Sequence, residues 1–155
     1  MMPKLVINTV DEFQNLTDKE LGVSEWLTIN QTMIDHFADA TLDHQWIHID
    51  SQRAREESPF GSTIAHGYLL VSLIPHFLEQ IFSVSNLDHI VNYGIDKLVF
   101  KAPVPVNSRL RMRGFLKSSK DLGGICLAQI QCVMEIEDSE TPVLEGVIKY
   151  LYYFK

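Results

Sequence analysis

The sequence lacks the features that mark membrane-spanning, disulfide-rich and nucleic-acid-binding proteins. It has no run of about 18 apolar residues, the length that a transmembrane helix requires, and it contains only two cysteines. Its 13 basic residues are outnumbered by 20 acidic ones, for a net charge of −7, whereas nucleic-acid binding relies on a basic surface. We therefore expect one soluble domain over residues 1–155, with neither membrane nor nucleic acid as a partner.

The two cysteines also bear on the compartment. Cys126 and Cys132 fall within one predicted strand, where six residues span about 20 Å, far beyond the reach of a disulfide. We expect both thiols to be free and reduced. The apolar stretch at the N-terminus is too short for a secretion signal, so the sequence favours a cytoplasmic protein.

The order of the predicted elements indicates an α+β fold. Helices are expected over 10–20 (capped at Thr9 and ended by Gly22), from Asn30, from Asp50 to Glu57 and over 66–82, and strands over 26–29, 91–101, 108–117, 124–137 and 143–154. The 66–82 segment is apolar on almost every side, which is typical of a buried helix, and Pro75 should kink or divide it. The later strands would form an antiparallel sheet packed on that helix.

The candidate chemistry lies in the first half of the chain. Asp43 and His48 are five residues apart, and Gly67 begins the apolar helix soon after. An imidazole can exchange protons near neutral pH, and a carboxylate can orient a water molecule. Free N–H groups at the start of a helix can hold an oxygen that gains negative charge. These parts suit the addition or removal of water next to a thioester carbonyl.

The motifs around this pair resemble those of a known family. Asp43-x4-His48, followed by Pro59-Phe60-Gly61 and Ile64-Ala65-His66-Gly67, is similar to the hydratase-2 motif of MaoC-like dehydratases, or R-specific enoyl-CoA hydratases. Asn92-Tyr93-Gly94-x-x-Lys97 and the stretch 102–106 are similar to the NodN-like branch of that family. The combination is specific, although each motif alone would be weak.

The resemblance implies a hot-dog fold, in which an antiparallel sheet wraps a long central helix and two subunits join their sheets in a homodimer. It implies hydration of a trans-2-enoyl-CoA, or of an acyl-carrier thioester, to the (3R)-3-hydroxyacyl thioester in fatty-acid metabolism. No metal or organic cofactor is expected. Asp43 and His48 would be catalytic, and Gly67, His66 and Ile64 would bind the oxyanion or the substrate.

Less specific interpretations remain open beside this one. Asp43 could be a turn residue, and His48 a hydrogen-bonded core residue. His44 and His48, four residues apart, could hold a metal ion, but the sequence indicates no third ligand. His66 could either pack at the helix start or touch the substrate. The fold could instead serve an acyl-CoA thioesterase, or a dimeric module that binds acyl thioesters without turnover.

Two further positions carry hypotheses of their own. Arginines 109, 111 and 113 alternate, so on a strand they share one face, which would be either solvated or used to bind a phosphate of CoA. Leu42 stands where the family usually has glycine. Its side chain would either narrow the acyl pocket or pack in the core.

Overall fold

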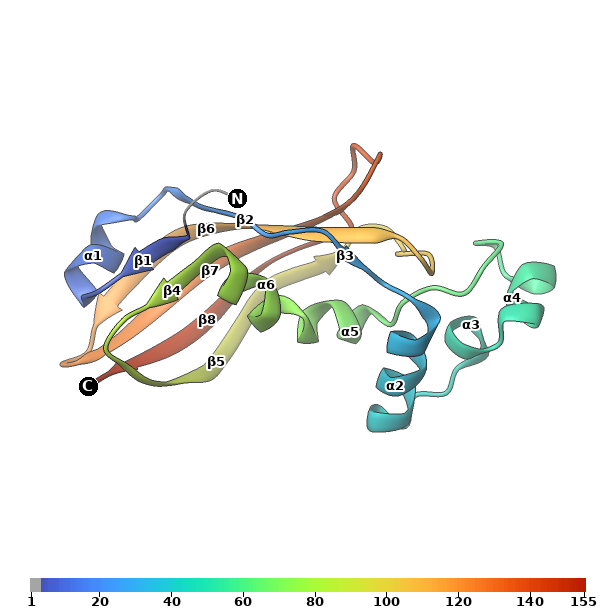
Figure 1. Ribbon diagram of the computed structural model, residues 1–155, viewed down its shortest axis with the longest axis horizontal. Helices are drawn as coiled ribbons and strands as arrows, with labels where there is room; N and C mark the ends of the chain where they lie inside the picture. The colour runs from blue at the N-terminus through green and yellow to red at the C-terminus, as the bar shows by residue number, and fades with distance from the viewer. Residues whose placement is uncertain (1–3) are drawn as a thin grey trace.

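The largest feature of the structure, a computed structural model that describes residues 4–155, is a curved sheet (Figure 1). The strands are β1 Leu5–Ile7, β2 Glu20–Val23, β3 Leu27–Thr28, β4 Phe82–Val84, β5 Leu87–Phe100, β6 Arg109–Asp121, β7 Ile125–Ile136 and β8 Leu144–Phe154. The main sheet is antiparallel, with the order β2-β6-β7-β8-β5 and with β3 also paired to β6. β1 and β4 form a separate parallel pair. The four long strands β5 to β8 confirm the strands predicted for the second half.

In the part of the chain that the structure describes, six helices precede or interrupt these strands. They are α1 Val10–Asn15, α2 Gln31–Thr41, α3 Trp46–Ile49, α4 Ser51–Glu57, α5 Gly67–Ser72 and α6 Ile74–Ile81. The predicted N-caps are confirmed by side-chain oxygens that accept backbone N–H groups three residues on: Thr9 from Glu12 at 3.2 Å, Asn30 from Met33 at 2.9 Å and Asp50 from Arg53 at 3.0 Å. Each cap satisfies an N–H group that has no partner within its helix.

The helix predicted over 10–20 is wrong in its second half. α1 ends at Asn15, and the chain then pairs with the edge of β6 as β2. Gly22 therefore lies in a strand and does not end a helix. A Cβ atom at Gly22 would lie 3.2 Å from the side chain of Ile81, so the glycine allows β2 and α6 to pack closely. Backbone pairing with β6 outweighs the local helical pattern.

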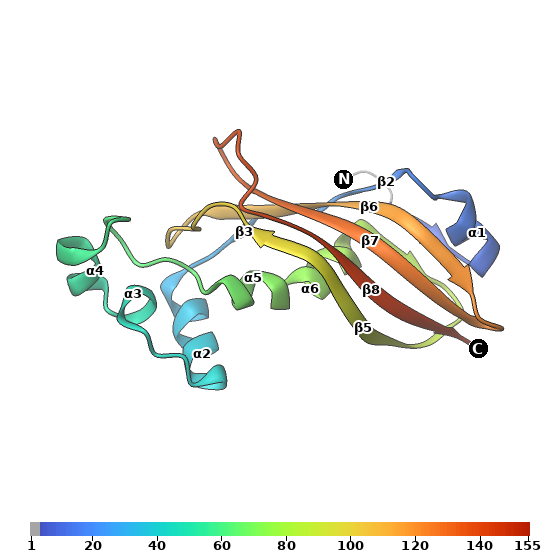
Figure 2. The same ribbon diagram turned by 180° about the vertical axis from the view of Figure 1, so that it is seen from behind.

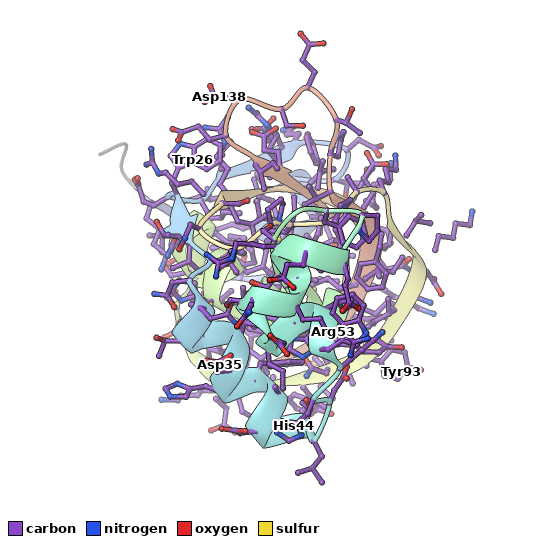
Figure 3. All side chains as sticks on the ribbon, turned by 90° about the vertical axis from the view of Figure 1, so that its right-hand side faces the viewer. Trp26, Asp35, His44, Arg53, Tyr93 and Asp138 are labelled. Atoms are coloured by element: carbon purple, nitrogen blue, oxygen red, sulfur yellow. The ribbon has the colours of Figure 1, made fainter. Side chains whose placement is uncertain are left out.

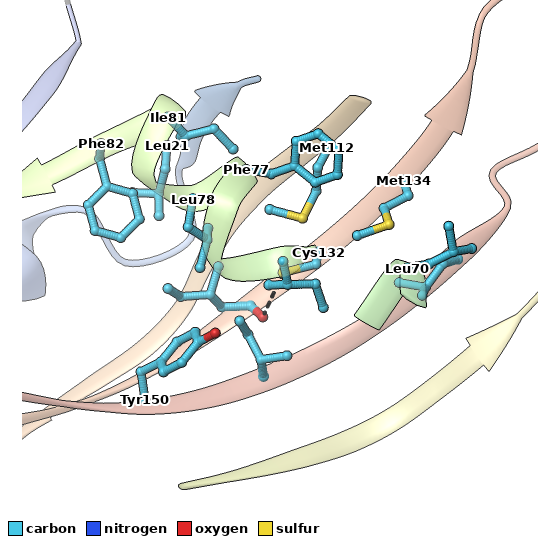
Figure 4. Close-up of a cluster of buried hydrophobic side chains, with 14 of the residues drawn as sticks. Leu21, Leu70, Phe77, Leu78, Ile81, Phe82, Met112, Cys132, Met134 and Tyr150 are labelled. Carbon is cyan, nitrogen blue, oxygen red and sulfur yellow. Dashed lines mark hydrogen bonds between the residues drawn. The ribbon is translucent and has the colours of Figure 1, made fainter. Parts of the chain in front are cut away.

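The helix predicted over 66–82 is present as α5 and α6, divided at Leu73, with Pro75 in the first turn of α6. Proline is tolerated there because a first-turn N–H has no partner within the helix. The side facing the sheet is apolar, and Figure 4 shows this cluster, which includes Leu70, Phe77, Leu78, Ile81, Met112, Cys132 and Met134. The expectation of burial on all sides is wrong, because the sheet covers one side only and Tyr68 on the other is 74% exposed.

This arrangement, a helix held in the hollow of a curved antiparallel sheet, is the hot-dog fold, and the predicted α+β class is confirmed (Figures 1 and 2). Cys126 and Cys132 lie on the buried face of β7 as free thiols, as predicted. Burial raises their pKa values to about 11 and about 12, so both thiols stay protonated and unreactive at neutral pH. Within residues 4–155, no helix is both long and apolar enough to span a membrane.

Candidate active site

The three helices α2 to α4, residues 31–57, form a helical segment beyond one end of the sheet (Figures 1 and 2). Asp43 lies in the turn between α2 and α3, and His48 lies in α3. The chain then returns to the sheet, where an isolated bridge joins Ile64 to Pro105. The structure brings the predicted site residues together around one hollow of about 530 Å³, lined among others by Asp43, His48, Ile64, His66 and Gly67.

The ring of His48 is buried, and its hydrogen bond fixes which nitrogen is free. Its Nδ1 atom lies 2.7 Å from the backbone oxygen of Ile64. A carbonyl oxygen can only accept, so Nδ1 carries the hydrogen and Nε2 keeps its lone pair. The carbonyl of Ile64 therefore orients the imidazole of His48. This is the geometry that a general base requires. That Ile64 also binds the oxyanion or the substrate stays a prediction, although Ile64 lines the hollow.

The backbone of His48 is held from a second direction. The side-chain amide of Gln31 donates to the backbone oxygen of His48 at 2.7 Å, and the hydroxyl of Thr63 donates to the amide oxygen of Gln31 at 2.6 Å. Thr63 is almost fully buried. Sequence reasoning missed both residues, because a single glutamine and a single threonine give no local signal for contacts across 17 and 32 positions.

The environment of His48 favours its neutral form. Burial lowers the pKa of His48 below its usual 6.5, and the neighbouring His66 lowers this pKa further. The hydrogen bond to Ile64 and the carboxylate of Asp43 act in the opposite direction, but desolvation dominates. At neutral pH the Nε2 atom of His48 is therefore ready to accept a proton.

His66 packs directly against this imidazole. The two rings are stacked, with centroids 3.9 Å apart and planes inclined by 23°, and Phe37 lies against His66 with its ring centroid 4.9 Å away. The Nε2 atom of His66 lies 3.0 Å from the backbone oxygen of Asp43, so this nitrogen carries the hydrogen and donates it. His66 is 2% exposed. The structure thus places His66 between the two residues of the predicted catalytic pair.

Gly67 begins α5 beside this cluster. The N–H groups of Gly67 and Tyr68 belong to the first turn, so they have no acceptor within the helix. A Cβ atom at Gly67 would lie 2.9 Å from the ring of Phe100. Glycine is therefore required here for the close approach of Phe100 to the helix start. Phe100, which sequence reasoning also missed, lines the hollow and is 45% exposed.

A metal ion is a poor fit to this cluster as it is arranged. Asp43, His48 and His66 each offer a possible ligand atom, and these atoms lie within 4.8 Å of one another. However, an ion bound by two imidazoles must lie close to the plane of both rings. Planes that are stacked 3.9 Å apart and inclined by 23° do not meet within the usual metal–nitrogen distance of about 2 Å. The absence of a metal cofactor remains a prediction.

The structure does not bring His44 to the cluster, so the predicted alternative of a His44/His48 metal pair is wrong. His44 lies at the outer surface of the helical segment, where its Nε2 atom is 2.9 Å from the carboxylate of Asp39 (Figure 3). The two histidines are four residues apart, but the helix does not reach His44. α2 ends at Thr41, and α3 begins only at Trp46.

The alternating arginines form ion pairs with neighbouring side chains. Arg109 pairs with Glu137 and Arg111 with Glu135, both at 2.6 Å, and the guanidinium group of Arg111 lies 4.3 Å from the ring centroid of Trp26. These contacts join β6, β7 and the start of β3 on the outer face of the sheet. The site that was suggested for a CoA phosphate is thus occupied by structural ion pairs.

Leu42 fits neither of the two positions that the sequence suggested. Its side chain is 80% exposed, and it is not among the residues that line the hollow. Its backbone has φ 64° and ψ 19°, the left-handed conformation that ends α2. Glycine adopts this conformation without steric cost. A glycine at this position would therefore serve the turn rather than the acyl pocket.

The structure has a hot-dog fold with an aspartate and a histidine beside the start of its central helix. Comparison with known proteins shows to which family of hot-dog proteins the chain belongs. Residues 12–130 match the family model described as MaoC like domain. The chain is 43% identical to 3-hydroxyacyl-thioester dehydratase Z of Mycobacterium tuberculosis over 136 residues, which cover 86% of this chain and 89% of the relative. This protein therefore belongs to the MaoC-like dehydratase family.

Two further comparisons agree with this assignment. The chain is 43% identical to Nodulation protein N of Rhizobium leguminosarum bv. viciae over 135 residues, which cover 81% of this chain and 80% of the relative. The resemblance to the NodN-like branch is thus confirmed. The structure of an R-hydratase from Pseudomonas aeruginosa superposes with a TM-score of 0.72 at 17% identity, covering 90% of this chain and 83% of the other. That similarity establishes the hot-dog fold.

Proposed function

We propose that this protein catalyses the reversible hydration of a trans-2-enoyl-CoA to the (3R)-3-hydroxyacyl-CoA in fatty-acid metabolism. The observation that carries the proposal is the free Nε2 atom of His48, whose Nδ1–H is fixed by the carbonyl of Ile64 at 2.7 Å. This base lies with Asp43 in the hollow where α5 begins. The chain's similarity to a 3-hydroxyacyl-thioester dehydratase supports the substrate class, and its structural similarity to an R-hydratase supports the R configuration.

The reaction uses these groups in turn. Nε2 of His48 accepts a proton from water while the water oxygen bonds to the β-carbon. The electrons of the double bond move toward the thioester oxygen, and the N–H of Gly67 would hold that oxygen as it gains charge. The Asp43 carboxylate orients the water, and the pair then returns a proton to the α-carbon. Water is thus divided between the two carbons, and no redox partner is needed.

The acyl chain has a path that leads away from the pair. Two further hollows, of about 320 and 450 Å³, follow α5 and α6 along the inner side of β5, and both are lined by Asn92 and Tyr150. Val71 and Ile74 line the nearer hollow, and Leu78 lines the farther one. The sequence assigned no role to Asn92, and its place in both hollows supports a role in contacting the acyl chain.

The proposal includes a homodimer joined through β5. Within residues 4–155, β5 pairs on one side only, with β8. Its exposed large side chains are mostly apolar and include Ile90, Val91, Tyr93, Ile95, Val99 and Phe100 (Figure 3 shows Tyr93). An exposed apolar edge strand is a site for pairing with another chain. A second copy of β5 would continue the sheet and cover these residues.

The dimer can be tested by sedimentation. Wild type should sediment as a dimer at working concentration, and Val99→Lys should shift the protein toward monomer because a charge on the edge opposes pairing. Leu122→Lys is a matched control, since Leu122 is 46% exposed in the turn between β6 and β7. A wild-type monomer, or equal effects of both substitutions, would contradict a β5 interface.

We also propose a cytoplasmic location, as favoured by the free, buried thiols of Cys126 and Cys132. Fractionation of cells that express the full chain tests this location directly.

The enzymatic proposal is tested by incubating the purified protein with crotonyl-CoA and with longer trans-2-enoyl-CoAs, following enoyl absorbance and thiol release together. A hydratase lowers the enoyl absorbance without releasing thiol, whereas a thioesterase releases thiol. Binding without either change would indicate a non-catalytic module. Asp43→Asn and His48→Ala should each lower the rate by about 100-fold or more, the usual size of a general acid–base contribution. His44→Ala is the matched control, because His44 lies on the same helical segment but contacts Asp39 outside the hollow.

A further inference from the structure

We infer that His66 is a positioning residue that acts through both members of the catalytic pair: its N–H holds the main chain of Asp43, and its ring holds the imidazole of His48. The inference rests on the proposed hydration reaction and gives His66 a role other than direct contact with substrate. Each half of the role depends on a separate contact.

The first contact fixes the turn that carries Asp43. The Nε2–H of His66 donates to the backbone oxygen of Asp43 at 3.0 Å, across 23 positions of the sequence. Among residues 4–155, the carboxylate of Asp43 itself makes only a 3.4 Å contact, with the N–H of Gln45 in the same turn. Because Gly67 follows His66 directly, this one bond sets the distance between the Asp43 turn and the start of α5. That distance separates the group that orients water from the N–H that holds the thioester oxygen.

The second contact fixes the plane of the His48 ring. The bond from Nδ1 to the carbonyl of Ile64 restrains one point of the imidazole, and the stacked ring of His66, 3.9 Å away, restrains rotation about that point. Phe37 packs against His66 at 4.9 Å and holds it in turn. His66 also covers a face of His48 that water would otherwise reach, since both rings are more than 90% buried.

The remaining nitrogen shows why His66 itself does not transfer protons. Its Nδ1 atom is buried and has no hydrogen-bond partner among residues 4–155. Protonation there would create a second buried N–H without an acceptor, next to the face of His48. The lone pair is shielded from solvent, so a substrate or water molecule has no access to it. The side chain of His66 therefore acts through its Nε2–H, as a hydrogen-bond donor, and through its flat ring, as a packing surface.

Two substitutions separate these functions. His66→Gln keeps an N–H donor near the Nε2 position but removes the ring, whereas His66→Phe keeps a flat ring but removes the donor. Both should lower kcat for enoyl-CoA hydration by about tenfold, with a smaller change in KM: His66→Phe because it loses one hydrogen bond, and His66→Gln because it loses the ring that holds the imidazole of His48. The acid limb of the pH–rate profile should move toward the ordinary histidine value of 6.5 in both variants, and further in His66→Gln, because that variant opens His48 to water as well as removing the neighbouring imidazole.

A double variant tests whether the donor acts through Asp43. If it does, adding His66→Phe to Asp43→Asn should cost much less than the tenfold that His66→Phe costs alone. Wild-type kcat and pH profile in both single variants, or a change confined to KM, would overturn the inference. Melting temperatures identify any variant that has lost the fold. If one single variant is lost in this way, the kcat and the pH profile of the other single variant test the inference.

A measurement that does not depend on turnover separates this inference from the proposed function. The ring of His48 can be titrated by NMR in wild type, His66→Gln and His66→Phe. The midpoint should rise in both variants, and it should rise further in His66→Gln than in His66→Phe. If wild type hydrates no enoyl-CoA, the proposed function fails, yet the titration still reports whether His66 controls His48. Equal midpoints in all three proteins would refute that control.

Discussion

Replacing Leu42 by glycine should stabilise the protein, although it removes a large side chain. Leu42 has φ 64° at the end of α2 and is 80% exposed, so it contributes little to the core. The left-handed conformation costs a residue with a Cβ atom about 1–2 kcal/mol. Glycine avoids that cost but adds about 0.5–1 kcal/mol of flexibility in the unfolded chain. The difference is a net stabilisation of about 0.5–1 kcal/mol, or a melting temperature higher by about 1–4 °C for a chain of this length.

Thermal and urea unfolding of Leu42→Gly, Leu42→Asn and Leu42→Ala provide the assay. Alanine keeps the Cβ atom and so the steric cost, and it should give no stabilisation. Asparagine tolerates the left-handed conformation and should fall between alanine and glycine. If Leu42→Gly melts no higher than Leu42→Ala, the backbone argument is refuted. The ratio of the hydration rates for short and long enoyl-CoAs should be the same in Leu42→Gly as in wild type. A selective gain for long chains would restore the hypothesis that Leu42 limits the acyl pocket.

Further predictions concern the site. Because the pKa of His48 lies below 6.5, hydration should persist below pH 6.5, and an acid limb at or above that value would contradict the assignment of His48 as base. Because the pKa of His48 is lower in the folded protein, the unfolded chain binds more protons below pH 6.5. The contribution of His48 to the free energy of unfolding should therefore be fully present above pH 6.5 and fall as the pH drops toward the folded pKa, as urea titrations can check. Gly67→Ala should lower hydration at least tenfold, because the added Cβ atom displaces the ring of Phe100, which lines the hollow; Gly67→Ala/Phe100→Ala should recover part of the rate. Activity should survive EDTA, and a loss that zinc reverses would show that a metal ion takes part in the reaction.

The sequence predicted those parts of the fold that depend on neighbouring residues. The caps at Asn30 and Asp50 each need a side chain and an N–H three positions later, and both are present. Strands β7 and β8 alternate between buried and half-buried residues over most of their length. By contrast, β2 was mistaken for the end of a helix, since its partner β6 lies about 90 positions away in the chain. Pairing at that distance leaves no mark in a local pattern.

The candidate site also has residues that the sequence predicted and residues whose roles follow from tertiary contacts. Asp43, His48 and Gly67 have a recognisable spacing, and the structure gathers them around one hollow. The sequence left two roles open for His66, because nothing near position 66 shows that its ring stacks on His48. Phe100 reaches the start of α5 from the last residue of β5, so its part in the hollow follows from tertiary packing alone.

We expect the helical segment that carries Asp43 and His48 to open as a unit of its own. The residues on either side of this segment are joined to the stretch before β6 by four backbone hydrogen bonds. The N–H groups of Ala65 and Ile29 donate to the oxygens of Val104 (2.8 Å) and Ser108 (2.9 Å), and the N–H groups of Val106 and Asn107 donate to the oxygens of Thr63 (2.9 Å) and Ile29 (2.7 Å). The helices of the segment lie outside the hollow of the sheet, where most of the apolar core is buried (Figure 1). Such a segment opens at lower free energy than the sheet, so its amide hydrogens exchange first. Hydration activity should then be lost on gentle heating while the strands are still intact, so an activity assay would report the stability of this segment rather than that of the whole chain.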